Sequence, residues 1–225
     1  MRNFRDLSYV GIKPNMLMRS DALGELSKED LLLLKEHNVK TVIDIRGLNE
    51  VEAKPDQEVD GITNLSIPLS MTRPPKPKII GEMEFLDMLD AYGQLVEIER
   101  KQSYQKIFEL LLNGDGGILY HCSEGKDRTG TLTAVILTTL GIDKDIIYQD
   151  YLETNKSSLS YREFAKTLPE RIRDIFIKEF SANKEYLDEV FNKIDELYGS
   201  FDNFLLEMCN IDDKKRQLLK EKYLT

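Results

Sequence analysis

The 225-residue sequence has no tryptophan, two cysteines and no apolar run that approaches the ~20 residues of a membrane-spanning helix. Cys122 and Cys209 provide no disulfide framework, and neither stands in a zinc-ligand pattern with His37 or His121. The N-terminal segment MRNFRDLSYV lacks the apolar stretch of an export signal. We therefore expect a cytoplasmic protein without a stable membrane anchor, although secretion by a route that reads no N-terminal signal would leave no trace in the sequence.

Positive charge is also scarce, because 31 lysines and arginines stand against 40 acidic residues and the formal net charge is −9. The chain as a whole lacks the electrostatic attraction that binding to nucleic acids or anionic membranes requires, so no nucleic-acid partner is expected. Any anionic ligand must be held by a local site. No linker composition separates the two halves of the chain, and we expect residues 1–225 to form one domain and to act as a monomer.

Short β-branched runs alternate with helix-like segments in the first part of the chain. The expected strands cover residues 39–46, 62–69 and 117–122, and the expected helices cover 28–37, 83–112, 129–140 and a segment that opens at Asp143. The proline-rich stretch 67–81 is expected to be a loop, and residues 161–224 are expected to form three or four amphipathic helices. This order predicts an α/β fold with a central, mostly parallel sheet flanked by helices and a largely helical C-terminal part.

The segment HCSEGKDRTG, residues 121–130, places Cys122 directly behind an expected strand and just ahead of an expected helix. Backbone N–H groups at a helix start have no intrahelical partner, so a loop at this position is an anion site, and Gly125 allows it to curl tightly. The same amides favour the thiolate form of Cys122, which makes it a nucleophile. Arg128 offers a planar pair of donors for two phosphoryl oxygens, and the Thr129 hydroxyl can donate to the sulfur when it leaves as thiolate.

The segment from Cys122 to Thr129 resembles the Cys-x5-Arg-Thr signature of cysteine-dependent tyrosine and dual-specificity phosphatases. The form HCxxGKDRTG is similar to the atypical bacterial branch of that superfamily. Outer motifs that share the resemblance occur in the same order, at residues 3–7, 19–20, 44–46 with Glu50, 150–152 and 198–200. Each is weak alone, and their order and spacing make the match specific. One departure is Ser8-Tyr9, where the family commonly has glycines.

The resemblance implies a metal-independent phosphomonoester hydrolase without a cofactor, which acts through a phosphocysteine intermediate. Cys122 would attack phosphorus, and Arg128 with the amides of residues 123–128 would bind the phosphoryl oxygens. An acid must protonate the leaving oxygen. The candidates are Asp127, within the signature as this branch implies, and Asp44, near the carboxyl end of a strand. Of the two we favour Asp127. The implied substrate-binding residues are Ser123, Glu124, Gly125, Lys126 and Thr129.

The implied substrates are phosphotyrosine proteins, with phosphoserine, phosphothreonine and phosphoinositides as further members of the class and inorganic phosphate as the product. Lys126 resembles the lysine that the family associates with additional substrate phosphates. Two other functions stay open at this level. One is a phosphate-recognising binding module with little turnover, and the other is a cysteine-based sulfur-transfer or arsenate-reducing enzyme. Arsenate reduction needs resolving thiols, and the only other cysteine is 87 positions away.

Several polar residues near the signature have structural interpretations. His121 is expected to orient the loop by hydrogen bonding rather than to act as acid or base. Asp44, Arg46 and Glu50 are expected either to take part in catalysis or to form an internal ion-pair set at a strand end. Cys209 is expected to be a buried helical cysteine without a chemical role. The apolar residues between Ile79 and Leu89 fit core packing better than a lid or a membrane-sensing helix.

Overall fold

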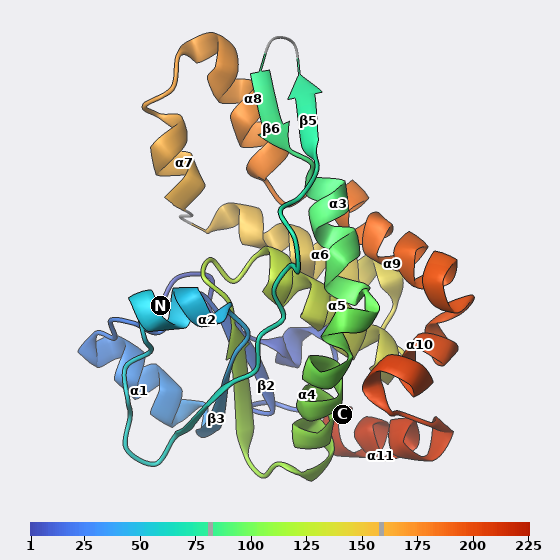
Figure 1. Ribbon diagram of the computed structural model, residues 1–225. Helices are drawn as coiled ribbons and strands as arrows, with labels where there is room; N and C mark the ends of the chain where they lie inside the picture. Colours follow the sequence, from blue (N-terminus) through green and yellow to red (C-terminus); the bar gives the residue numbers. More distant parts are fainter. Residues whose placement is uncertain (81–82, 158–159) are drawn as a thin grey trace.

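The computed structural model of the protein describes residues 1–80, 83–157 and 160–225 (Figure 1). Its central sheet has five strands in the order β1-β2-β7-β3-β4. The four strands from β2 to β4 in this order run parallel, and β1 pairs with β2 in the antiparallel sense. The expected α/β fold with a mostly parallel sheet is thereby confirmed. The strands of the sheet are β1 (Arg5–Asp6), β2 (Leu17–Ser20), β3 (Val39–Asp44), β4 (Thr63–Ser66) and β7 (Gly117–His121).

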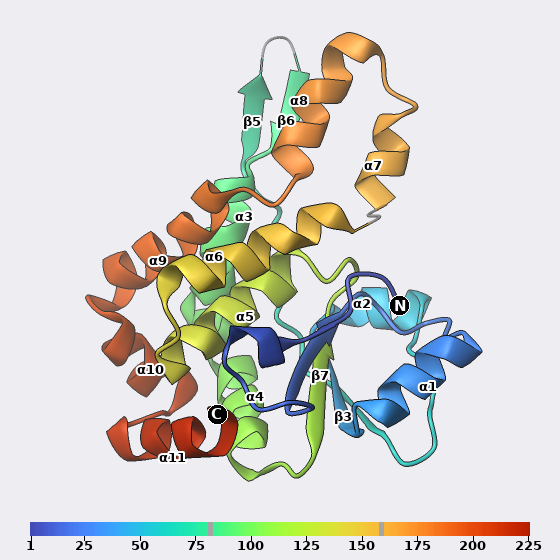
Figure 2. The same ribbon diagram turned by 180° about the vertical axis from the view of Figure 1, so that it is seen from behind.

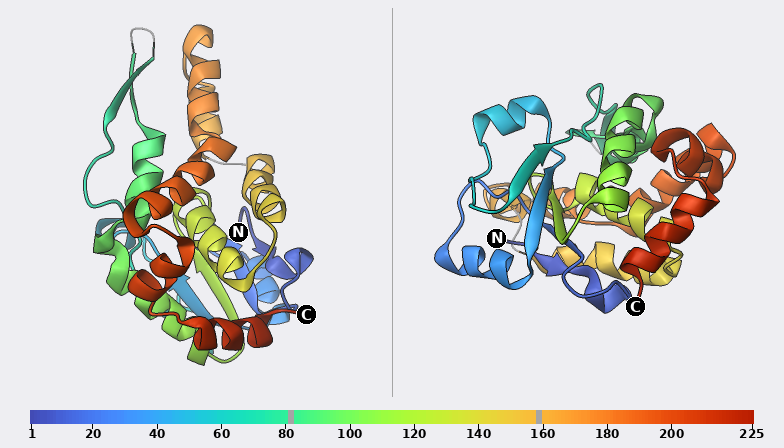
Figure 3. Two further views of the ribbon diagram at one scale, coloured as in Figure 1. Left: turned by 90° about the vertical axis from the view of Figure 1, so that its right-hand side faces the viewer. Right: turned by 90° about the horizontal axis from the view of Figure 1, so that it is seen from below.

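Helices cover both faces of the sheet (Figure 3). On one face α1 (Lys28–Glu36) covers a small core that includes Met18, Leu34 and Leu119. On the other face α4 (Lys101–Asn113) and α5 (Asp127–Leu140) enclose the main core, to which the C-terminal helices add their apolar sides. The alternation of buried side chains along β7 explains the two cores, because Leu119 belongs to the small one and Ile118 and Tyr120 belong to the main one.

The other helices lie at the ends of the strands and in the C-terminal part. They are α2 (Leu48–Ala53), α3 (Met88–Gly93), α6 (Lys144–Glu153), α7 (Ser160–Ala165), α8 (Glu170–Phe180), α9 (Lys184–Tyr198), α10 (Phe201–Cys209) and α11 (Asp213–Tyr223). From residue 160 onward the described chain thus contains five helices, where the sequence predicts three or four. Among the described helices, none combines the length and the apolar character needed to cross a bilayer.

Local capping residues explain where three of these helices begin or end. The side chain of Ser27 accepts from the Asp30 amide and Asp30 accepts from the Ser27 amide, which forms the capping box at the start of α1. Asp143 caps α6 by accepting from the Asp145 amide at 2.8 Å. The Ile142 amide donates to Leu137 O at 3.0 Å, as expected for a helix that ends at a left-handed glycine.

The prediction for residues 67–112 is partly wrong. Residues 77–80 and 83–86 form the antiparallel hairpin of β5 (Pro77–Ile80) and β6 (Met83–Leu86), where a loop and the start of a long helix are predicted. Short apolar runs fit a strand as well as a helix, so the spacing of the apolar residues does not decide between them. The helix begins only at Met88, because Asp87 caps it by accepting from the Leu89 amide. Residues 81 and 82 lie outside the described residues.

The β5–β6 hairpin and the pair α7–α8 project beyond the sheet at one end of the molecule (Figures 1 and 2). Lys78 Nζ donates to Glu179 Oε2 at 2.8 Å and thereby joins the hairpin to α8. The Phe176 ring contacts the rings of Phe164 and Phe180, with centroid distances of 5.4 and 4.4 Å. Ile79 and Leu86 of this projecting hairpin are 66% and 47% exposed, whereas Phe85 is buried. The core packing expected for the apolar residues between Ile79 and Leu89 is therefore confirmed for Phe85 and Met88 and wrong for Ile79 and Leu86.

Candidate active site

The signature segment forms the loop that joins β7 to α5, and its carbonyl groups are bound from outside. The Ala22 amide donates to Ser123 O at 3.2 Å. Asn3 Nδ2 donates to the carbonyls of Glu124 and Gly125 at 3.1 and 2.8 Å. No cis peptide bond occurs in the described chain, so the N–H groups of residues 124–126 point away from these carbonyls, toward the interior of the loop. An anion site requires this orientation of the backbone donors.

Gly125 is required by the shape of the loop. Its φ angle is +65°, a left-handed conformation that side chains with a Cβ rarely adopt. A Cβ at this position would also lie 2.3 Å from Ser20 O, which belongs to the neighbouring strand β2. Any other residue would push the loop off β2 and misalign the amides that follow it.

Cys122 and Arg128 stand at the two ends of the loop. Cys122 is buried with 3% exposure, at the end of β7. Arg128 Nη2 donates to Glu50 Oε1 at 2.8 Å, and the Ser123 hydroxyl donates to the same oxygen at 2.5 Å. Burial opposes the charge of Arg128, but the hydrogen bond with Glu50 and the nearby Cys122 sulfur outweigh burial and raise the pKa of the guanidinium. The Arg128 guanidinium thus interacts electrostatically with the Cys122 sulfur across the loop.

The sequence leaves Glu50 open between a part in catalysis and an internal ion-pair set with Asp44 and Arg46. In the structure Glu50 extends from α2 and pairs with Arg128, whereas Arg46 pairs with Asp44 and Asp56. The hydrogen bond from Arg128 is the largest cause that lowers the pKa of Glu50 to about 2, and the Ser123 hydroxyl and the Gly47 amide contribute. The Glu50 carboxylate therefore fixes the orientation of the Arg128 guanidinium.

We expect the Glu50→Gln variant to lose thermal stability at neutral pH, with a deficit that depends on pH. The folded-state pKa of Glu50 is depressed from 4.5 to about 2. Its stabilising contribution is therefore fully present above pH 4.5 and disappears as the pH falls toward 2. Melting temperatures of the wild type and the variant, measured from pH 7 down to pH 3, should converge on the acid side. A difference in melting temperature that stays constant with pH would contradict the ion pair between Glu50 and Arg128.

Asp127 is the first residue of α5, and it lies beside Arg128 on a cavity. Its Oδ1 accepts from the Tyr92 hydroxyl, which comes from α3. Lys126 Nζ lies 3.4 Å from the same oxygen. The Lys126 ammonium also donates to Phe180 O and lies 4.9 Å from the centroid of the Tyr161 ring, so it is directed toward α7 and α8.

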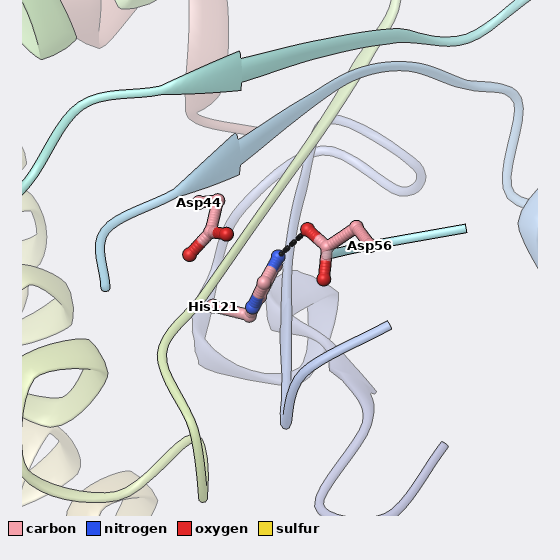
Figure 4. Close-up of side chains that lie close together, drawn as sticks. All are labelled: Asp44, Asp56 and His121. Atoms are coloured by element: carbon pink, nitrogen blue, oxygen red, sulfur yellow. Dashed lines mark hydrogen bonds and ion pairs between the residues drawn. The ribbon is translucent and has the colours of Figure 1, made fainter. Parts of the chain in front are cut away.

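Asp44 lies near His121 and Asp56 (Figure 4), and its own partner in this buried network is Arg46. Its two carboxylate oxygens accept from Arg46 Nε and Nη2 at distances from 2.6 to 3.1 Å. Asp56 bridges Arg46 Nη2 at 2.9 Å and His121 Nε2 at 2.7 Å. The ligand atoms of Asp44, Asp56 and His121 lie within 4.8 Å of one another, which is close enough for a metal ion, but the Arg46 guanidinium already supplies the cation between the two carboxylates. The arrangement is that of an internal ion-pair network.

This network reaches the loop between β7 and α5 through His121. Its Nδ1 lies 3.1 Å from Cys122 O, and its Nε2 faces Asp56, so the ring fixes the peptide that follows the cysteine. The expected orienting contact of His121 is confirmed. Sequence reasoning missed Asp56, because a single aspartate in a loop 65 residues ahead of the histidine carries no local signal.

A second buried network supports the loop from the side of β2. Arg19 is fully buried, and it donates to Asp150 Oδ2 at 2.6 Å and to Gly125 O at 2.7 Å. Arg5 Nε donates to Asp150 Oδ1 at 2.7 Å. Burial favours the neutral acid, but Arg19 and Arg5 outweigh burial and lower the pKa of Asp150. The outer sequence motifs at residues 3–7, 19–20 and 150–152 thus converge beneath the phosphate loop.

A cavity of about 880 Å³ opens beside the loop. Its charged lining residues include Glu50, Asp127 and Arg128, and Asp44 is not among the residues that line it. The rest of the wall is mainly apolar. The apolar lining residues include Leu48, Met71, Pro74, Leu86, Met88, Ala91, Tyr92, Leu95 and Phe180. Of the two predicted acids, Asp127 lines the cavity, whereas Asp44 is buried in an ion pair with Arg46.

Two further residues of the sequence analysis complete the comparison. The Thr129 hydroxyl is buried and has no hydrogen-bond partner in the described part of the chain, so its expected contact with the Cys122 sulfur is not formed in this structure. Cys209 is buried at the end of α10, as predicted, and burial raises the pKa of its thiol well above the ordinary value.

A strand, a cysteine-to-arginine loop whose carbonyls are bound from outside and a buried helix form an arrangement that is suited to bind a phosphoryl group. The sequence model of the tyrosine phosphatase family matches residues 1–225. The chain belongs to this family, and the protein is a tyrosine phosphatase.

Known relatives share this assignment at moderate identity. The chain is 26% identical over 250 residues to the triple specificity protein phosphatase PtpB of Mycobacterium tuberculosis, and the match covers 90% of both chains. It is 27% identical over 152 residues to a tyrosine-protein phosphatase of Nostoc commune, which covers 63% of this chain and 49% of that protein. The core catalytic domain of the PP-IP phosphatase SIW14 from S. cerevisiae is 18% identical with a TM-score of 0.39, over 87% of this chain and 94% of that domain. The last likeness is too distant to bear on function.

Proposed function

We propose that this phosphatase hydrolyses phosphotyrosine side chains of proteins through a phosphocysteine intermediate. The Cys122 thiolate attacks phosphorus, while Arg128 and the inward-facing amides bind the nonbridging oxygens. Asp127 gives its proton to the tyrosine oxygen as the P–O bond breaks. Water then attacks the phosphocysteine, Asp127 takes up a proton from that water, and inorganic phosphate and the Cys122 thiolate are released.

The choice of phosphotyrosine rests on the apolar cavity next to Arg128 and Asp127. The phenyl ring of a bound phosphotyrosine would be shielded from water between Arg128 and the apolar wall of the cavity. Its phosphate would remain at the loop. Burial of a ring of this size stabilises a complex by about 1.5–3 kcal/mol, which corresponds to roughly 10- to 100-fold in affinity. The short side chain of phosphoserine would leave the same apolar wall exposed to water.

Phosphoserine, phosphothreonine and phosphoinositides enter the proposal as slower substrates. PtpB, which is called a triple specificity protein phosphatase, is the relative that supports a breadth beyond phosphotyrosine. Lys126 does not line the cavity and its ammonium contacts Phe180 O, so we give it no part in binding a second substrate phosphate.

A kinetic panel tests the substrate order. Peptides that differ only in the phosphorylated residue should give a kcat/KM for phosphotyrosine at least about tenfold above that for phosphoserine, because only the ring fills the cavity. The kcat/KM of soluble phosphoinositides, measured in the same buffer, is the third comparison and should also lie below that of the phosphotyrosine peptide. Equal rates for the phosphotyrosine and phosphoserine peptides would refute the role of the apolar wall.

A further inference from the structure

Two buried tyrosines form a hydrogen-bonded chain that ends on Asp127. Tyr92 of α3 is fully buried, and its hydroxyl contacts Asp127 Oδ1. Tyr151 of α6 is 1% exposed, and its hydroxyl oxygen lies 2.5 Å from that of Tyr92. The two rings meet edge to face, with centroids 6.3 Å apart. Three separate helices therefore meet at one carboxyl group beside the phosphate loop.

The number of available protons determines which group donates and which accepts in the hydrogen bonds that join Tyr151, Tyr92 and Asp127. Asp127 Oδ1 accepts the single hydroxyl proton of Tyr92, and a carboxyl group that carries its own proton on Oδ2 keeps this acceptor. The oxygen of Tyr92 can then only accept from Tyr151, whose proton points toward it. Burial raises the pKa of both tyrosines well above the ordinary value, and the charge of Asp127 acts in the same sense. Both hydroxyls therefore stay protonated donors at working pH.

The last glycine of the signature makes room for this arrangement. A Cβ at Gly130 would lie 2.8 Å from Cδ2 and 2.9 Å from Cε2 of Tyr151. The Tyr151 ring thus lies directly on the first turn of α5, the helix that begins with Asp127. A larger residue at position 130 would displace the ring and break the chain of hydroxyls.

We propose that Tyr92, supported by Tyr151, is a positioning residue for the proton transfer by Asp127, an inference that rests on the proposed function of Asp127 as the acid. In the described part of the chain no donor contacts Asp127 Oδ2, while Oδ1 is held by Tyr92 and Lys126. The acid proton therefore belongs on Oδ2, and Asp127 itself lines the cavity. As this proton leaves for the substrate oxygen, negative charge grows on Asp127 and its hydrogen bond with Tyr92 becomes charge-assisted and stronger. An interaction that strengthens in the transition state accelerates the reaction.

The leaving-group dependence of kcat/KM tests this role. A poor leaving group such as that of phenyl phosphate needs the proton, whereas the nitrophenolate of p-nitrophenyl phosphate leaves almost without it. We expect Tyr92→Phe to lower kcat/KM about tenfold with phenyl phosphate and less than about twofold with p-nitrophenyl phosphate. Tyr151→Phe should show the same selectivity with a smaller loss. In the Asp127→Asn background, Tyr92→Phe should cause no further loss, because the proton donor is already absent.

Tyr223→Phe is the matched control, since that buried hydroxyl of α11 donates to Leu111 O on α4, and neither residue lines the cavity. This variant should leave kcat/KM unchanged with both substrates. Thermal unfolding of all variants shows whether they fold alike. If Tyr92→Phe lowered kcat/KM equally with both substrates, Tyr92 would have only a structural role and the proposal would be overturned. The same holds if Tyr92→Phe lowered kcat/KM by its full factor again in the Asp127→Asn background. If Asp127→Asn itself lowered kcat/KM equally with both substrates, the assignment of Asp127 as the acid would also be refuted. Activity that survived in Cys122→Ser would instead refute the proposed mechanism as a whole.

Discussion

Replacement of Cys122 by serine should abolish turnover of phosphotyrosine peptides, with a loss on the order of 10⁴-fold or more in kcat. A serine hydroxyl in the same place stays protonated at neutral pH and is a far weaker nucleophile than a thiolate. The carbonyls of the loop would still be held by Asn3, Arg19 and the Ala22 amide. The inward-facing amides should therefore keep binding the phosphopeptide, which titration calorimetry on the variant would measure.

The matched control is Cys209→Ser, at the other cysteine of the chain, which should retain wild-type turnover because Cys209 lies buried at the end of α10. Turnover in Cys122→Ser within about tenfold of the wild type would contradict a cysteine nucleophile. Loss of turnover in Cys209→Ser, with a normal fold, would point instead to a resolving thiol and to the sulfur-based alternative.

Replacement of Arg128 by lysine should lower kcat/KM by about 10²–10³-fold although the charge is kept. The guanidinium bonds to Glu50 through both Nη atoms, and an ammonium lacks the planar shape to reproduce this two-pronged contact while it binds a phosphoryl group. Arg216→Lys on α11, which alters an arginine that binds Thr139 O and Asp202, is the matched control for arginine chemistry in general. A loss below about tenfold for Arg128→Lys would mean that charge alone suffices at this position.

The phosphate loop was predictable from sequence because its parts are contiguous. Cys122, Gly125 and Arg128 lie within one short segment, and the strand before it and the helix after it fix how that segment must turn. The capped starts of α1 and α6 were predictable for the same reason, since each depends on neighbouring residues. Physical reasoning on a sequence succeeds where the interacting groups are close along the chain.

The remaining parts of the site depend on contacts between distant segments. Tyr92 meets Asp127 across 35 positions, and Asp56 meets His121 across 65. Glu50 reaches Arg128 instead of Arg46, a choice that depends on the placement of α2 beside the loop. The same limit explains the wrong prediction for residues 77–86, where pairing between two short strands outweighs the helical spacing of a few apolar residues.

The buried cluster of Arg5, Arg19 and Asp150 has a consequence for how an acidic protein captures a dianion. Two guanidinium groups share one carboxylate beneath the loop, so the cluster retains an excess of positive charge where water cannot screen it. Arg19 also donates to Gly125 O, so this positive charge lies directly behind the loop, where it favours an anion at the loop amides. A molecule with a formal charge of −9 can therefore present a focused attractive potential at one point of its surface and repel anions elsewhere.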